Sequence, residues 1–97
     1  MEFVEIVIDG SIPVDRDDIE EGLNEALVGY GEVTGAGTSE AGSHLDVDIE
    51  RGSNRSLILE RIFGVLEALS VGDSVRVRPG DGNDWVRPSE WRGKDKG

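Results

Sequence analysis

Three carboxylates occupy alternate positions at the end of the stretch GYGEVTGAGTSEAGSHLDVDIE, residues 29–50. Asp46, Asp48 and Glu50 alternate with apolar residues, the pattern of a strand with one buried and one solvated face. At ~3.3 Å per residue, successive carboxylates would lie about 7 Å apart on one face. Such a row could bind a cationic partner, coordinate a divalent metal or only face solvent. Metal is the least favoured, because carboxylates this far apart rarely converge on one ion without loop ligands.

The glycines of the same stretch are arranged for a turn rather than for a phosphate site. A dinucleotide site needs G-x-G-x-x-G between a strand and a helix, so that the helix N-terminus meets the pyrophosphate. Here Gly35 and Gly37 are followed by Gly42, a strand comes next, and no G-K-[ST] is present. Glu32 and Glu40 would also repel a phosphate. We predict a β-hairpin, in which glycine supplies positive φ and bulges, and which can take part in recognition.

The remaining polar residues offer no catalytic or metal-binding constellation. His44 is the single histidine, has no evident nucleophile beside it, and is accompanied by no cysteine anywhere in the chain. The DGND of residues 81–84 lacks the spacing of a calcium loop and is interpreted as a turn. We therefore predict a protein that is not an enzyme and that carries no cofactor and no metal.

The elements that would position these residues follow the order β-α-β-β-α-β. This order predicts a single-domain α+β fold of the ferredoxin-like kind, an antiparallel four-stranded sheet with two helices on one face. The usual strand order, 4-1-3-2, would place the first and third strands in the centre. The domain would span residues 1–79. The expected strands are residues 3–9, 32–37, 44–50 and 74–78, and the helices follow Asp15 and Ser53 or Asn54.

The expected second helix is apolar over more than half of its circumference. One apolar stripe would pack on the sheet, and the other needs a second cover. Residues 80–97 are turn-rich and carry both Trp85 and Trp91. We expect this C-terminal extension to pack back on the helix through its tryptophans and to end in a frayed basic tail.

Charge is distributed unevenly along the chain. Residues 1–50 hold fourteen acids and one base, a sum of −13, whereas residues 51–97 hold seven acids and nine bases, a sum of +2, which together give −11. Such a field repels nucleic acids and anionic membranes and attracts basic partners. The N-terminus MEFVEIVIDG has no signal-peptide pattern, and no segment approaches the ~20 apolar residues of a membrane span. We expect a cytoplasmic protein.

The segment GEVTGAGTSEAGSHLDVDIE resembles a pattern found in small bacterial proteins: a strand, a glycine-rich hairpin and an alternating acidic strand. The predicted architecture also resembles that of small acidic inhibitors, including immunity proteins that block toxins and phage proteins of the anti-CRISPR kind that block host defence enzymes. The likeness covers about a third of the chain. It implies inhibition by binding and carries over no catalytic residue.

These observations predict an acidic binding protein that inhibits a basic protein partner, such as a nuclease or a nucleic-acid-binding complex, by mimicking nucleic acid and occluding its cationic groove. The alternative is a homodimeric module that binds a small ligand in a pocket lined by Phe3, Val7 and His44. The predicted partner-binding residues lie on the third strand, the hairpin and the first helix. They are Asp46, Asp48, Glu50, Glu32, Glu40, Asp17, Asp18 and Glu21.

Overall fold

The computed structural model describes residues 2–9, 15–39, 42–80 and 82–95. These residues form an α+β domain whose four strands make one antiparallel sheet. The strands are β1 (Phe3–Asp9), β2 (Gly31–Ser39), β3 (Gly42–Ile49) and β4 (Val75–Pro79). The helices are α1 (Arg16–Ala26), α2 (Arg55–Ala68) and α3 (Pro88–Asp95), and a short 3-10 turn, η1 (Gly72–Ser74), precedes β4.

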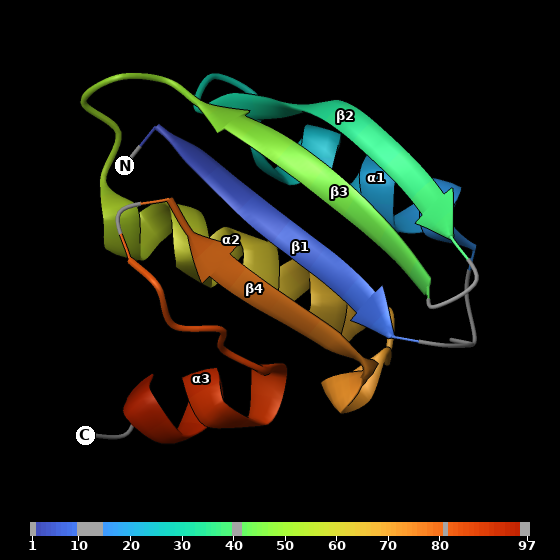
Figure 1. Cartoon of the computed structure of the whole chain (residues 1–97). Coiled ribbons are helices and arrows are strands. Elements are labelled where there is room, and N and C mark those ends of the chain that lie inside the picture. Colours follow the sequence, from blue (N-terminus) through green and yellow to red (C-terminus); the bar gives the residue numbers. More distant parts are fainter. Residues whose placement is uncertain (1, 10–14, 40–41, 81, 96–97) are drawn as a thin grey trace.

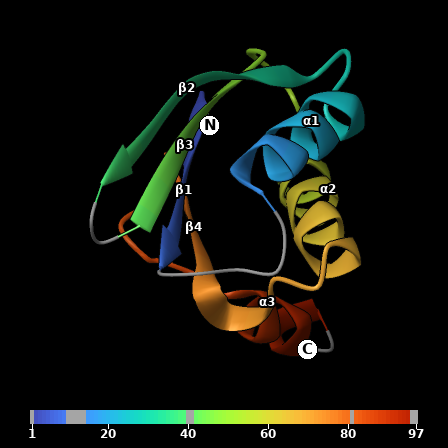
Figure 2. The same cartoon turned by 90° about the vertical axis from the view of Figure 1, so that its right-hand side faces the viewer.

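The sheet runs in the order β2-β3-β1-β4, so β1 and β3 are its central strands, as expected from the sequence. Helices α1 and α2 cover one face, and the other face is left open (Figures 1 and 2). Alternate apolar residues of β1, β3 and β4 point toward the helices and are buried, whereas Phe3 and Val7 of β1 are not. Their polar neighbours point to the open face, where the acidic alternation was predicted to lie.

Helix α1 begins after Asp15, whose backbone oxygen accepts the first helical bonds from Asp18 and Ile19. Its buried side chains include Ile19 and Leu23, which have the helical spacing expected from the sequence. Gly22 lies on the side of α1 that meets α2, where an added Cβ would stand 2.9 Å from Val65 Cγ1. Glycine lowers the intrinsic stability of a helix, but at position 22 it allows the two helices to pack closely.

Helix α2 is capped by Asn54, whose side chain accepts a hydrogen bond from the backbone N–H of Leu57 at 3.1 Å. Five of its side chains are buried, which accounts for its unusually broad apolar surface. None of the helices in the described part of the chain is both long and apolar enough to cross a membrane. The buried residues of α2 are Ile58, Leu59, Ile62, Phe63 and Leu66.

The C-terminal extension differs from the sequence prediction, because it contains helix α3 instead of turns alone. The ring of Trp91 in α3 stacks on Phe63 of α2 with centroids 5.0 Å apart and an interplanar angle of 9°. Asp73 receives hydrogen bonds from the backbone N–H and the hydroxyl of Ser89, at 3.1 and 2.7 Å. Tertiary contacts thus hold a helix that is too short to be stable by itself.

Candidate partner-binding surface

Glu32, Asp46 and Asp48 form a continuous acidic patch on the open face of the sheet. Asp46 and Asp48 are exposed on β3, between core residues that point the other way. Glu32 is exposed on β2 and lies directly opposite Asp48 in the β2–β3 ladder. The predicted alternation is therefore confirmed for β3, and the hairpin adds a third carboxylate beside it. We call these three residues the acidic patch.

The arginines of the same face are bound elsewhere. Arg78 forms an ion pair with Glu5, and Arg76 and Arg87 both approach Asp9, at 3.5 and 3.7 Å. The guanidinium groups of Arg76 and Arg78 also lie over the ring of Trp85, 5.0 and 5.7 Å from its centroid. Within the described part of the chain, no cation forms an ion pair with the acidic patch. Its charge is therefore available to a partner.

The glycines of β2 make room for side chains that lean across from β3. A Cβ added at Gly35 would stand 3.0 Å from Asp46 Oδ2, and one added at Gly37 would collide with the ring of His44. Gly35 follows the register shift that begins after Val33, which is the bulge expected of a glycine-rich hairpin. The structure thus gives the glycine stretch a role in shaping the acidic surface. This role depends on the register between β2 and β3, which cannot be deduced from the sequence alone.

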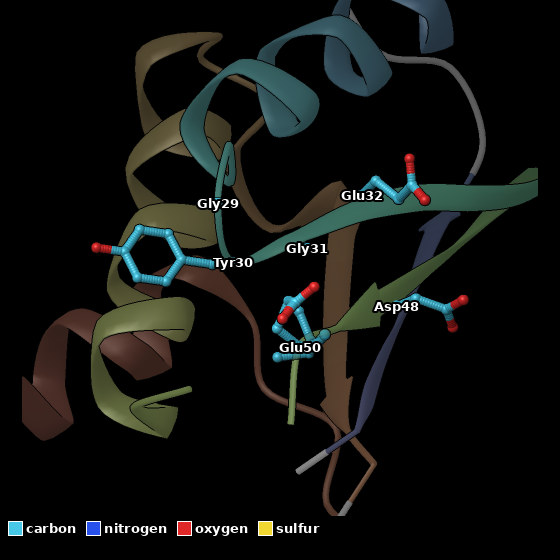
Figure 3. Close-up of a pocket in the computed structure, with 7 residues that line it drawn as sticks. Gly29, Tyr30, Gly31, Glu32, Asp48 and Glu50 are labelled. Atoms are coloured by element: carbon cyan, nitrogen blue, oxygen red, sulfur yellow. The ribbon is translucent and has the colours of Figure 1, made fainter. Parts of the chain in front are cut away.

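Glu50 lies just beyond β3 and lines a hollow of about 260 Å³ with the turn that leads into β2. Figure 3 shows that its carboxylate, those of Glu32 and Asp48, and the ring of Tyr30 do not converge on one point. Among the described residues, no three acidic or histidine side chains are grouped so that they could hold a metal ion. The arrangement suits an extended cationic surface better than a single ion.

The predicted site residues do not form a single surface. Asp17, Asp18 and Glu21 are exposed on α1, which lies on the helix-covered side of the sheet (Figure 2), whereas the acidic patch lies on the open face. Glu40 lies outside the described residues. The sequence prediction groups these acids by their shared charge, but the crossover from β1 through α1 to β2 places them in different layers.

The alternative pocket is present only in part. Val7 and His44 lie opposite each other in the β1–β3 ladder and line a hollow of about 240 Å³ with Arg76. Phe3 does not line this hollow, since it lies at the other end of β1 against Gly80. The three residues predicted to share a ligand pocket are therefore separated along the strand.

Comparisons with protein-family models, with curated proteins and with solved structures give no significant match.

Proposed function

We propose that this protein is a non-enzymatic acidic binding protein that docks a basic protein partner on the acidic patch of its open sheet face. The observation that carries the proposal is the unpaired state of Glu32, Asp46 and Asp48 within the described chain, next to arginines that are bound to other carboxylates. Exposed carboxylates of one sign attract a cationic surface and accelerate its encounter. A partner whose basic groove normally holds phosphates fits this chemistry best.

The mode of action that we propose is inhibition by occlusion. A nucleic-acid-processing enzyme in the cytoplasm would present arginines and lysines to the patch, and bound carboxylates would keep nucleic acid out of the groove. The resemblance to small acidic inhibitors supports the same mode of action. Paired strands hold the backbone that carries the carboxylates, so little backbone entropy remains to be lost on binding.

The fold that we propose for this role is the ferredoxin-like sandwich. The strand order β2-β3-β1-β4, read from the other edge, is 4-1-3-2, and antiparallel pairing is found between all neighbours. Two helices on one face leave the opposite face of such a sheet free for binding (Figure 2). Helix α3 and the segment before it would be additions to that core.

The experiment is a capture from native-host extract with wild-type protein, the double variant D46K/D48K and the charge-matched control E60K/D84K. Glu60 and Asp84 are exposed and lie away from the acidic patch, and each double variant changes the net charge by the same amount. We expect wild type and control to retain one basic enzyme at low salt and to inhibit it. The D46K/D48K variant should not retain it. Equal capture by all three would overturn the proposal.

A further inference from the structure

The two edges of the sheet differ in how their backbone is covered. Beyond β4, the segment around Val86 forms an antiparallel bridge with Val77 through two hydrogen bonds of 2.8 Å. Beyond β2, no strand follows in the described part of the chain (Figure 1). One edge of the sheet is closed by the protein itself, and the other is open.

Within the described part of the chain, the open edge is protected near its start by a contact with α1. The N–H of Val33 points outward and donates to Asn24 Oδ1 of α1 at 2.8 Å. Val33 lies opposite Val47, and Ala36 lies opposite Leu45, two residues along β3. Because hydrogen-bonding direction alternates along an antiparallel strand, Ala36 directs its N–H and C=O outward, as Val33 does. Ala36 is exposed, so this position of β2 presents a backbone edge with which an added strand can pair.

Acidic side chains flank this edge on both sides. In front of it lie Glu32 and Asp46, in the acidic patch. On the helix side of the sheet, a hollow of about 470 Å³ is lined by α1 residues that include Asp17, Glu21 and Asn24. The first turns of α1 lie behind the arrowhead half of β2 (Figure 1). Asp17 and Glu21 therefore lie on the same side of α1 as Asn24, the residue that contacts the start of β2, whereas Asp18 does not line this hollow.

We propose that an extended, cationic segment of the basic partner docks on the outer edge of β2 as a fifth strand. This inference rests on the proposed function and names the element of the partner that is recognised. Successive side chains of an added strand point to opposite faces of the sheet. One basic strand would therefore reach the acidic patch in front and the acids of α1 behind. Backbone hydrogen bonds to Ala36 would supply affinity, and the two acidic surfaces would supply specificity.

A second copy of this chain is the competing occupant, and charge argues against it. Pairing β2 with its own copy would bring each acidic surface against an equivalent one. Like charges placed opposite each other oppose association. The edge also has no lysine or proline within β2, the residues that commonly prevent strand addition. Its acidic surroundings therefore disfavour a second copy and favour a basic strand.

The test uses as its probe a synthetic acetylated heptapeptide, KKVVKKV, whose paired lysines would point to both faces of the sheet when it adds as a strand. The controls are the same peptide with alternate amides N-methylated, and a glutamate–valine peptide. Binding is measured by fluorescence anisotropy at low and moderate salt. We expect the lysine peptide to bind and to slow amide exchange at Ala36, and we expect both controls to bind at least about tenfold more weakly, because each loses hydrogen bonds or charge pairing.

The variants A36P and A36S separate the edge from the patch. A36P removes the outward backbone N–H of residue 36 without removing a hydrogen bond to β3. A36S keeps that N–H. Circular dichroism verifies the fold of each variant. We expect A36P to weaken the peptide about tenfold and A36S to leave it unchanged. If D46K/D48K weakens binding but A36P and N-methylation do not, edge docking is wrong and the proposed function stands. If none of these changes matters, both are wrong. Self-association that A36P abolishes would identify a second copy and overturn the basic strand.

Discussion

Glu32 on β2 and Asp48 on β3 lie directly opposite each other in the ladder, and both are exposed. Like charges at directly opposed positions destabilise a sheet. We expect E32Q and D48N each to raise the free energy of unfolding by a few tenths of a kcal/mol. Urea denaturation at low and high salt measures the effect, which should shrink as salt screens the repulsion.

The matched control for this prediction is E60Q, on the exposed side of α2. Because it has no opposed carboxylate in the ladder, it should change stability little at either salt concentration. A gain of stability on removing charge, together with a loss of partner binding, is the signature of residues kept for function at the cost of stability. Destabilisation by both E32Q and D48N would show that these carboxylates have supporting contacts instead.

Gly22 and Gly64 are both helix-interior glycines, but they have different surroundings. A Cβ at Gly22 would stand 2.9 Å from Val65 Cγ1, whereas one at Gly64 would meet nothing within 4 Å. We expect G64A to stabilise the protein by about 1 kcal/mol through helix propensity. We expect G22A to destabilise it, and the added substitution V65A to recover part of the loss. Thermal unfolding of the wild type and these three variants tests this, and a stabilising G22A would contradict the close packing of α1 and α2.

Trp91 and Trp85 should contribute unequally to stability. Trp91 is stacked on the buried Phe63, whereas Trp85 lies under the guanidinium groups of Arg76 and Arg78. We expect W91A to cost about 2 kcal/mol, because it exposes part of the core, and W91F to retain much of the stacking. We expect W85A to cost less than about 1 kcal/mol. Urea denaturation followed by circular dichroism compares them, and equal losses would contradict the assignment.

The strand β3 and helix α2 are well predicted from the sequence because each carries a strong local signal. The alternation through Asp46 and Asp48 defines a half-buried strand, and Asn54 followed by an apolar run defines a capped helix. The second strand is longer than predicted, since Gly31 and Ser39 belong to it. Glycine usually indicates a loop, but here glycines are accommodated in a paired strand because side chains from β3 lie across them.

Other features depend on contacts between residues that are far apart in the sequence, so the local sequence gives little indication of them. Pro88 at the first position of α3, with Glu90 accepting a hydrogen bond from the backbone N–H of Arg87, is a helix-start signal that could have indicated α3. The short segment is helical because Asp73 and Phe63 hold it. Likewise, the division of the acids between the sheet face and α1 follows from the crossover, and the position of Glu32 opposite Asp48 follows from the register.

Asp73 should stabilise α3 locally without supporting the rest of the fold. Its carboxylate accepts from Ser89 N–H at 3.1 Å and from Ser89 Oγ at 2.7 Å, so it acts as an N-terminal cap supplied from outside the helix. We expect D73A to lower the protection of α3 amides from hydrogen exchange by about fivefold, corresponding to roughly 1 kcal/mol for a lost cap. Amides of β1 and β3 should keep their protection. S89A is the matched control, because it removes the hydroxyl bond and leaves the backbone bond, and it should have a smaller effect. Loss of protection across the sheet in D73A would show instead that α3 is part of the global folding unit.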